Sequence, residues 1–290
     1  MTSKSDYIRK ESYNDVSDKV RQFQQTWEVE KPRAAVMVTH GHGEHSDSYN
    51  RLIDGLRSLD FNFMSFDFRG HGRSSGRRGY VESIEDYISD IEFAFASFSK
   101  RYEKLPRFCI AHSMGCMIQT RFFLKHPEAQ KQVLAQVLSS PFFGLSLDVP
   151  VWKKWGSNYL NRYLPKVTVY SEVKNEQLTH DKSVIREYER DTLRHTRVSP
   201  GAFLGFLESF EMIPSRAGEI LLPTLLQVPE NDPVVSTPIS REWFGKLKNP
   251  LNDIYIYPNC HHEIYNEVAR TTVYADTRNY LEKILKGTNS

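Results

Sequence analysis

The fold of this chain is decided by Phe108-Cys109-Ile110-Ala111-His112-Ser113-Met114-Gly115-Cys116. An apolar, strand-like run ends at a serine, and a run compatible with a helix begins directly after it. This small-x-Ser-x-Gly pattern is typical of a nucleophile elbow, a tight strand–turn–helix that exposes a serine hydroxyl. Ala111 and Gly115 leave the room that such a turn needs. We therefore expect a strained backbone at Ser113, with its hydroxyl at the start of a helix whose amides face developing negative charge.

Length and composition describe an ordinary globular protein. The chain has 290 residues, and its 39% hydrophobic and 26% charged residues can build a sizeable core. A net charge of +2 gives no case for nucleic acid as a partner, because nucleic-acid binding usually needs a concentrated basic face. No stretch approaches the roughly 20 apolar residues that span a bilayer, and the polar start does not resemble a signal peptide. Three scattered cysteines fit a reducing compartment, so the expected location is the cytoplasm.

Apolar runs alternate with amphipathic runs on both sides of the elbow. Continuous apolar runs predict strands buried on both faces, and their alternation with helices predicts a mostly parallel sheet with helices on both faces. Polar loops follow several of these strands, at the edge where such sheets bind ligands. Strands are expected at Arg21–Val29, Ala34–Thr39, Phe61–Phe68, Val133–Ser139, Leu221–Val228 and Ile254–Tyr257, and helices at Tyr49–Leu59, Ser83–Tyr102, Ile239–Leu247 and Val273–Leu285.

One segment interrupts this alternation. From 142 to 213 the chain is rich in aromatic residues and helical in period, without a convincing strand. This pattern predicts a helical cap or lid inserted into an α/β core. The expected organisation is an N-terminal core part over 1–141, the cap over 142–213 and a C-terminal core part over 214–290.

Two further groups follow later strands in the order that serine chemistry needs. A serine hydroxyl requires a base to take its proton, and the base requires a third group to hold its tautomer. Asp232 ends one predicted strand, and His262 follows the next. The sequence therefore predicts Ser113 as nucleophile, His262 as base and Asp232 as the acid that orients it.

The same chemistry needs donors for the oxyanion. The backbone amide of Met114, directly after the nucleophile, is one candidate. The loop His40-Gly41-His42-Gly43 ends the first parallel strand and offers the backbone amide of His42 as the second. The segment Asp67–Ser74 is expected to be scaffold that ties this loop to its neighbours, without a catalytic role for His71.

The motifs together resemble the monoacylglycerol lipase and lysophospholipase branch of the α/β-hydrolases. The resemblance runs from about Ala34 to the last helix and is carried by His-Gly-x-Gly-Glu-His-Ser (40–46), Asp-x-Arg-Gly-His-Gly-x-Ser-x-Gly (67–76), His-Ser-Met-Gly (112–115), Asn-Asp-Pro (231–233) and His-Glu-Ile (262–264). It implies an α/β-hydrolase fold and a serine hydrolase that cleaves monoacyl lipids through an acyl-enzyme, with no cofactor or metal. Ala111 departs from the family pattern, and so does Asn259-Cys260-His261, which places a thiol and a second histidine beside the base. We expect Cys260 to lie close to the pocket.

Alternatives stay open at this point. A general carboxylesterase or thioesterase has the same fold, and a catalytically silent receptor would need a broken triad. The run of His40, His42, Glu44 and His45 is close to the ligand run of metal-dependent hydrolases. If the substrate is a monoacyl lipid, the cap should meet a membrane surface. The run Val149–Trp155 mixes indoles with lysines, which suits such a transient peripheral contact.

Overall fold

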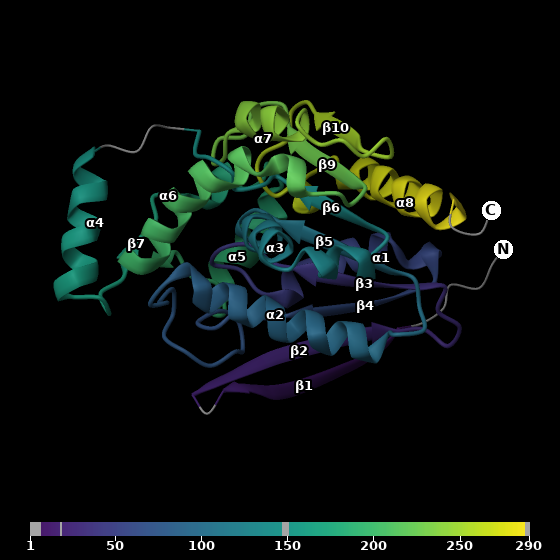
Figure 1. Cartoon of the computed structure of the whole chain (residues 1–290), viewed down its shortest axis with the longest axis horizontal. Helices are drawn as coiled ribbons and strands as arrows, with labels where there is room; N and C mark the ends of the chain where they lie inside the picture. Colours follow the sequence, from purple (N-terminus) through teal and green to yellow (C-terminus); the bar gives the residue numbers. More distant parts are fainter. Residues whose placement is uncertain (1–6, 18, 147–150, 288–290) are drawn as a thin grey trace.

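A central sheet of eight strands organises the molecule (Figure 1). The computed structural model describes residues 7–17, 19–146 and 151–287. The strand order is β1-β2-β4-β3-β5-β6-β9-β10; β1, β2 and β4 pair antiparallel, and all remaining neighbours pair parallel. The strands are β1 (Ile8–Ser17), β2 (Val20–Glu28), β3 (Ala34–Thr39), β4 (Phe61–Phe66), β5 (Arg107–His112), β6 (Ala135–Ser139), β9 (Thr224–Pro229) and β10 (Asp253–Tyr257).

Two apolar layers cover the sheet, one on each face. Helices α2, α3, α6 and α7 supply side chains to one cluster, and α1 and α8 supply side chains to the other. Strands β3 and β4 are buried along their whole length, as their continuous apolar runs predict. The α-helices are α1 (Asn50–Gly55), α2 (Ile84–Arg101), α3 (Met114–Lys125), α4 (Val151–Tyr163), α5 (Lys182–Arg190), α6 (Pro200–Ser215), α7 (Thr237–Phe244) and α8 (Arg270–Gly287).

The predicted sheet and its helices are confirmed, although several of their bounds shift by up to three residues. Three further differences concern the shape of the elements. The strand expected over Phe61–Phe68 ends at Phe66, because the following residues turn toward the scaffold loop. The helix expected over Tyr49–Leu59 is split: two short 3₁₀ helices, η1 (Ser46–Tyr49) and η2 (Arg57–Leu59), flank the six residues of α1. The N-terminal antiparallel part is larger than expected, since β1 and β2 together form a long ribbon.

The segment expected to form the cap, 142–213, lies in the connection between β6 and β9. This connection contains α4, α5 and α6 together with a 3₁₀ helix, η4 (Asn175–Gln177). It also contains β7 (Val169–Tyr170) and β8 (Arg197–Val198), a two-residue antiparallel pair that the sequence did not predict because two residues carry no periodicity. Figure 1 shows α4 at one end of the molecule and α8 at the other. Val149 and Pro150 of the indole–lysine run lie outside the described residues.

Candidate active site

The elbow places Ser113 between β5 and α3 in a backbone conformation that side chains rarely adopt. Its φ is 52° and its ψ is −120°, so the predicted strain is present. A side chain at Gly115 would collide with the carbonyl oxygens of Thr39 and His40, at 2.6 and 2.5 Å from an added Cβ. An added Cβ at Gly41 would come within 3.1 Å of the Ser113 Cβ. The glycines therefore let the first parallel loop lie directly against the serine.

Three side chains from different strand ends form one hydrogen-bonded chain. The Ser113 Oγ lies 2.8 Å from Nε2 of His262, and Nδ1 of His262 lies 2.8 Å from Oδ2 of Asp232. The other oxygen of Asp232 accepts the backbone N–H groups of Val234 and Val235 at 2.8 and 3.1 Å. Because Asp232 accepts from Nδ1, Nε2 of a neutral His262 is left to accept the serine proton. The structure thus brings together the three residues that the sequence singled out.

Electrostatics favour a base held by an ionised acid. Burial alone would lower the pKa of His262, but the Asp232 carboxylate outweighs burial, and the pKa is raised above its ordinary value of 6.5. Burial alone would raise the pKa of Asp232, but His262 and the two N–H donors keep it lowered. The neighbouring His112 is different: burial lowers its pKa to about 3, so this imidazole stays neutral beside the base, 4.8 Å away between ring centroids.

The two backbone amides proposed as oxyanion donors belong to α3 and to the loop after β3, which meet at Ser113. Met114 is the first residue of α3, where a helix leaves its N–H groups without intrahelical partners. His42 follows Gly41, which contacts Ser113. Among the described residues, neither N–H donates to a protein acceptor. Both amides therefore remain available to a developing oxyanion.

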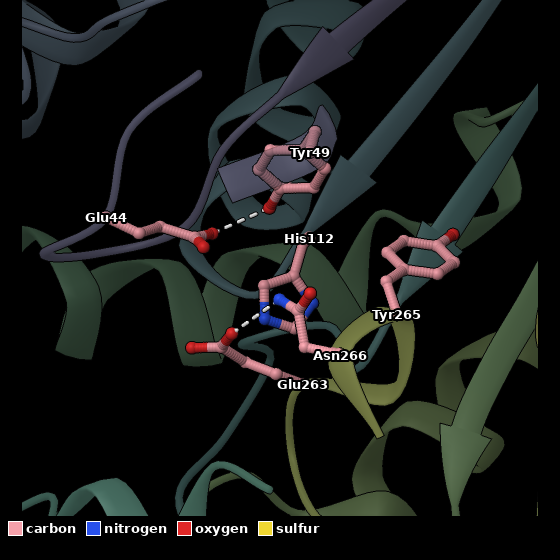
Figure 2. Close-up of a pocket in the computed structure, with 6 residues that line it drawn as sticks. All are labelled: Glu44, Tyr49, His112, Glu263, Tyr265 and Asn266. Carbon is pink, nitrogen blue, oxygen red and sulfur yellow. Dashed lines mark hydrogen bonds between the residues drawn. The ribbon is translucent and has the colours of Figure 1, made fainter. Parts of the chain in front are cut away.

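Behind the serine lies a buried charged network that the sequence analysis missed. Glu44, in the oxyanion loop, accepts the N–H of Gly41 at 2.5 Å and the hydroxyl of Tyr49 at 2.6 Å. Glu263, next to the base, accepts from Asn266 at 2.9 Å (Figure 2). Both carboxylates are buried, with relative exposures of 3% and 4%. Like charges buried close together need a cation between them.

That cation comes from the cap. Arg194, between α5 and β8, lies 2.7 Å from Glu263 and 3.8 Å from Glu44, nitrogen to oxygen. Tyr188 of α5 donates its hydroxyl to Glu263, and its ring stacks under the guanidinium at 3.8 Å. Burial would raise the pKa of Glu263, but Arg194 holds it well below its ordinary value. The pKa of Glu44 is raised, by burial and by Glu263. No sequence periodicity marks Arg194, so only the structure could reveal it.

The network also encloses a small cavity of about 10 Å³. Figure 2 shows the six side chains that line it: Glu44, Tyr49, His112, Glu263, Tyr265 and Asn266. Its volume is that of a single water-sized sphere, far too small for an acyl chain. The cavity therefore belongs to the support of the site and not to a substrate pocket.

The histidines of the possible metal run do not converge. Nε2 of His40 accepts the N–H of Phe68 at 3.0 Å, while Nε2 of His45 pairs with Asp191 of the cap at 2.8 Å. The His42 ring packs instead against the rings of His71 and His195, at 5.6 and 5.5 Å between centroids. These contacts give the three histidines structural partners in different directions, which does not favour the metal-dependent alternative.

The scaffold loop behaves as the sequence predicts. Asp67 accepts the backbone N–H groups of Ser46 and Arg73, both at 2.7 Å, and so ties the oxyanion loop to the loop after β4. Arg69 anchors that loop to α2 through a buried ion pair with Asp90 at 2.7 Å. The segment therefore holds the backbone of the neighbouring loops in place.

The structure does not favour Cys260 as an accessible thiol of the pocket. Its side chain is 3% exposed and belongs to the apolar cluster beneath α1 and α8. Burial raises the pKa of the thiol to about 11, so little reactive thiolate forms near neutral pH. His261, in contrast, is partly exposed and contacts the cap.

Comparison with known proteins identifies the family of the chain. Residues 30–269 match the family described as serine aminopeptidase, S33. The chain is 26% identical to phospholipase YtpA of Bacillus subtilis, over 90% of this chain and 99% of that protein. It is 26% identical to human monoglyceride lipase, over 83% and 79%. The chain is also 28% identical to an uncharacterised abhydrolase domain-containing protein of Dictyostelium discoideum. That alignment covers 88% of this chain but only 27% of the longer relative.

A solved structure extends the comparison to the fold. Monoacylglycerol lipase of Paleococcus ferrophilus superposes with a TM-score of 0.81 and 24% identity, over 91% of this chain and 99% of that one. The predicted α/β-hydrolase fold is thereby confirmed. None of the described helices is long and apolar enough to cross a membrane. By its family match and its fold, the chain belongs to the serine aminopeptidase, S33, family and is a monoacylglycerol lipase-like α/β-hydrolase.

Proposed function

We propose that this protein hydrolyses the carboxylic ester of monoacyl lipids, monoacylglycerols or lysophospholipids, through an acyl-enzyme on Ser113. The hydrogen-bonded chain from Asp232 through His262 to Ser113, with 2.8 Å at each step, is the observation that carries the proposal. The substrate class rests on the relatives named phospholipase and monoglyceride lipase. A general carboxylesterase or thioesterase of the same fold is the alternative.

The geometry supports a two-step reaction. His262 takes the proton of Ser113 as Oγ attacks the acyl carbonyl, and the oxyanion binds the amides of His42 and Met114. When the tetrahedral intermediate collapses, the protonated His262 gives its proton to the leaving alcohol, and the acyl group stays on Ser113. Water then attacks this ester with His262 as base, which releases the fatty acid and restores the serine.

The cap supports contact with a lipid surface. Trp152, Trp155, Tyr159 and Tyr163 follow one another at spacings of three and four residues, so they share one face of α4. Their exposed fractions are 70%, 78%, 63% and 58%. Tryptophan and tyrosine suit an interface because the ring is apolar and one edge can hydrogen-bond to water. We therefore assign α4 as the part of the cap that touches the membrane surface, without insertion.

Chain-length specificity tests the substrate class. We expect kcat/KM to rise from acetyl to long-chain monoacyl esters, because each buried methylene contributes up to about 0.8 kcal/mol, or roughly fourfold. Triacylglycerols, diacyl phospholipids and an aminoacyl anilide serve as comparison substrates, and Ser113→Ala is the blank. A preference for acetyl esters or for the anilide, with no gain from chain length, would overturn the proposal.

Membrane contact needs its own experiment. Trp152→Ser/Trp155→Ser should lower activity on monoacylglycerol in vesicles and leave hydrolysis of a short soluble ester unchanged. Leu221→Ser, which alters an exposed apolar side chain outside the cap, is the matched control and should change neither. Equal losses on both substrates would contradict a surface-contact role for α4.

A further inference from the structure

A second cluster of ligand-type side chains lies beside the base, apart from the triad. His261 precedes the base His262, Glu267 follows the same loop, and His180 comes from the cap between η4 and α5. Their candidate nitrogen and oxygen atoms all lie within 4.8 Å of one another. Among the residues that the structure describes, this is the one group of three such side chains brought so close together.

Glu267 is the fixed member of this cluster. Its side chain is only 1% exposed. Oε1 accepts the backbone N–H groups of His180 and His261 at 3.0 and 2.9 Å, and Oε2 accepts the N–H of Val268 at 2.9 Å. A carboxylate held by three backbone donors cannot swing away. It therefore offers a preorganised anionic ligand at the seam between the cap and the base loop.

His261 has the tautomer that a metal ligand requires. Its Nδ1 lies 2.7 Å from the carbonyl oxygen of Glu176, and a carbonyl only accepts, so Nδ1 carries the hydrogen. The lone pair is then on Nε2. A backbone carbonyl bonded to one ring nitrogen is the usual support for a histidine whose other nitrogen binds a metal.

His180 is the adjustable member. Its ring lies over that of His261, with centroids 3.7 Å apart and planes tilted by 33°. Nδ1 of His180 now shares a hydrogen with Oε1 of Glu267 at 2.8 Å. The side chain is 47% exposed, so it can rotate and exchange this hydrogen bond for a bond to an ion, while Nε2 takes up the ring proton.

We propose that His180, His261 and Glu267 bind a divalent transition-metal ion of the zinc class. Two imidazoles and one carboxylate are a donor set that zinc accepts, and water from the exposed side would complete a tetrahedron. Metal–ligand bonds of about 2.0–2.2 Å in a tetrahedron place the ligand atoms about 3.3 Å from one another. The widest distance between the candidate ligand atoms therefore has to shorten by about 1.5 Å at most. The ion takes no part in ester hydrolysis.

The ion would fasten the cap to the base loop. The two segments already touch: the N–H of Glu263 donates to the Leu178 carbonyl at 2.8 Å, and the Thr179 hydroxyl donates to the Asn266 carbonyl at 3.0 Å. One ion coordinated by both His180 and His261 would add a stronger link at this seam. We therefore expect zinc to stabilise the protein and to slow its turnover by restraining the cap.

Metal binding is measured first, without reference to activity. Chelator-treated full-length protein is dialysed against zinc chloride, and bound zinc is counted by mass spectrometry. We expect one zinc per wild-type chain, a rise in melting temperature, and affinity at least ~10-fold weaker in His180→Ala and in His261→Ala. His126→Ala removes another histidine paired with a glutamate, Glu92 at 2.8 Å, and should bind as the wild type does.

Two results would overturn the assignment. One is wild-type protein that binds no zinc at a concentration that saturates simple two-histidine sites. The other is His180→Ala that binds as much zinc as His126→Ala. For the effect on turnover, zinc should inhibit wild type and His126→Ala reversibly, and should spare His180→Ala; equal inhibition of all three would show that zinc does not act through the seam.

Discussion

The core and the cap supply different kinds of residue to the same site. From the core come Ser113, Asp232 and His262, each in a loop directly after a parallel strand. From the cap come Tyr188, which lies on α5, and Arg194 and His180, which lie in the loops that flank this short helix. In the proposed mechanism the core residues react with the substrate, and the cap residues hold charge and loops around them. The difference implies that core substitutions should abolish chemistry, whereas cap substitutions should weaken positioning.

The largest effect is expected at the nucleophile. Ser113→Ala should lower ester hydrolysis by roughly 10⁴ to 10⁶-fold, because the acyl-enzyme can no longer form. The melting temperature should hold or rise, since alanine removes a hydroxyl without opening a cavity. Turnover of purified protein with a monoacyl ester is the measurement. Retained activity in Ser113→Ala would place the nucleophile elsewhere.

The acid comes next. Asp232→Asn should cost about 10⁴-fold in kcat, because the amide no longer favours the His262 tautomer with a free Nε2. The base must be neutral, so activity falls as pH drops through the raised pKa of His262, and the acid limb of kcat/KM should lie above 6.5.

Without the Asp232 charge, the effect of burial on the pKa of His262 dominates and lowers this pKa. The acid limb of the kcat/KM profile should then move to lower pH. A pH–rate profile with chelator present, for wild type and Asp232→Asn, checks both the size and the direction. An unmoved limb would mean that another group sets it.

The cap arginine should have a smaller effect with a different signature. Arg194→Met leaves Glu44 and Glu263 buried without their cation, which should cost about 3–5 kcal/mol of stability. Displacement of the oxyanion and base loops by about 1 Å should lower kcat roughly 100-fold. Denaturant unfolding and steady-state kinetics measure the two effects.

A second substitution separates charge from packing at the cap. Arg194→Met/Glu263→Gln removes one of the two buried charges left without a cation and should recover part of the lost stability. Arg197→Met, a cap arginine that bonds to exposed Tyr170, is the control and should change little. No recovery in the double variant would show that packing, not charge, matters at Arg194.

The smallest effect is expected beside the base. With chelator present, His261→Ala should retain hydrolysis within about twofold, because the His261 ring contacts the cap and lies outside the hydrogen-bonded chain to Ser113. His262→Ala should be inactive. Kinetics on the pair separate the two adjacent histidines, and the opposite pattern would reverse the assignment.

The same contrast explains what the sequence could predict. Buried parallel strands are continuous apolar runs, and residues after their carboxyl ends share one edge of the sheet; hence Ser113 and His262 could be paired across 149 positions. The helix predicted from Ser83 likewise begins at Ile84, directly after a capping box of Ser83 and Asp86.

Arg194 could not be found in this way. It approaches Glu44 and Glu263 only because two loops and the cap meet in space, and no local pattern encodes that meeting. Cys260 shows the converse limit: closeness in sequence to His262 did not mean an accessible thiol, because this side chain is buried in an apolar cluster.

Covalent labelling tests the central claim most directly. A fluorophosphonate reacts far faster with a serine that is activated by a base than with an ordinary serine. Intact mass followed by peptide mapping should show one adduct per chain, on Ser113, and no adduct in Ser113→Ala. An adduct on another residue, or normal labelling of Ser113→Ala, would contradict the account.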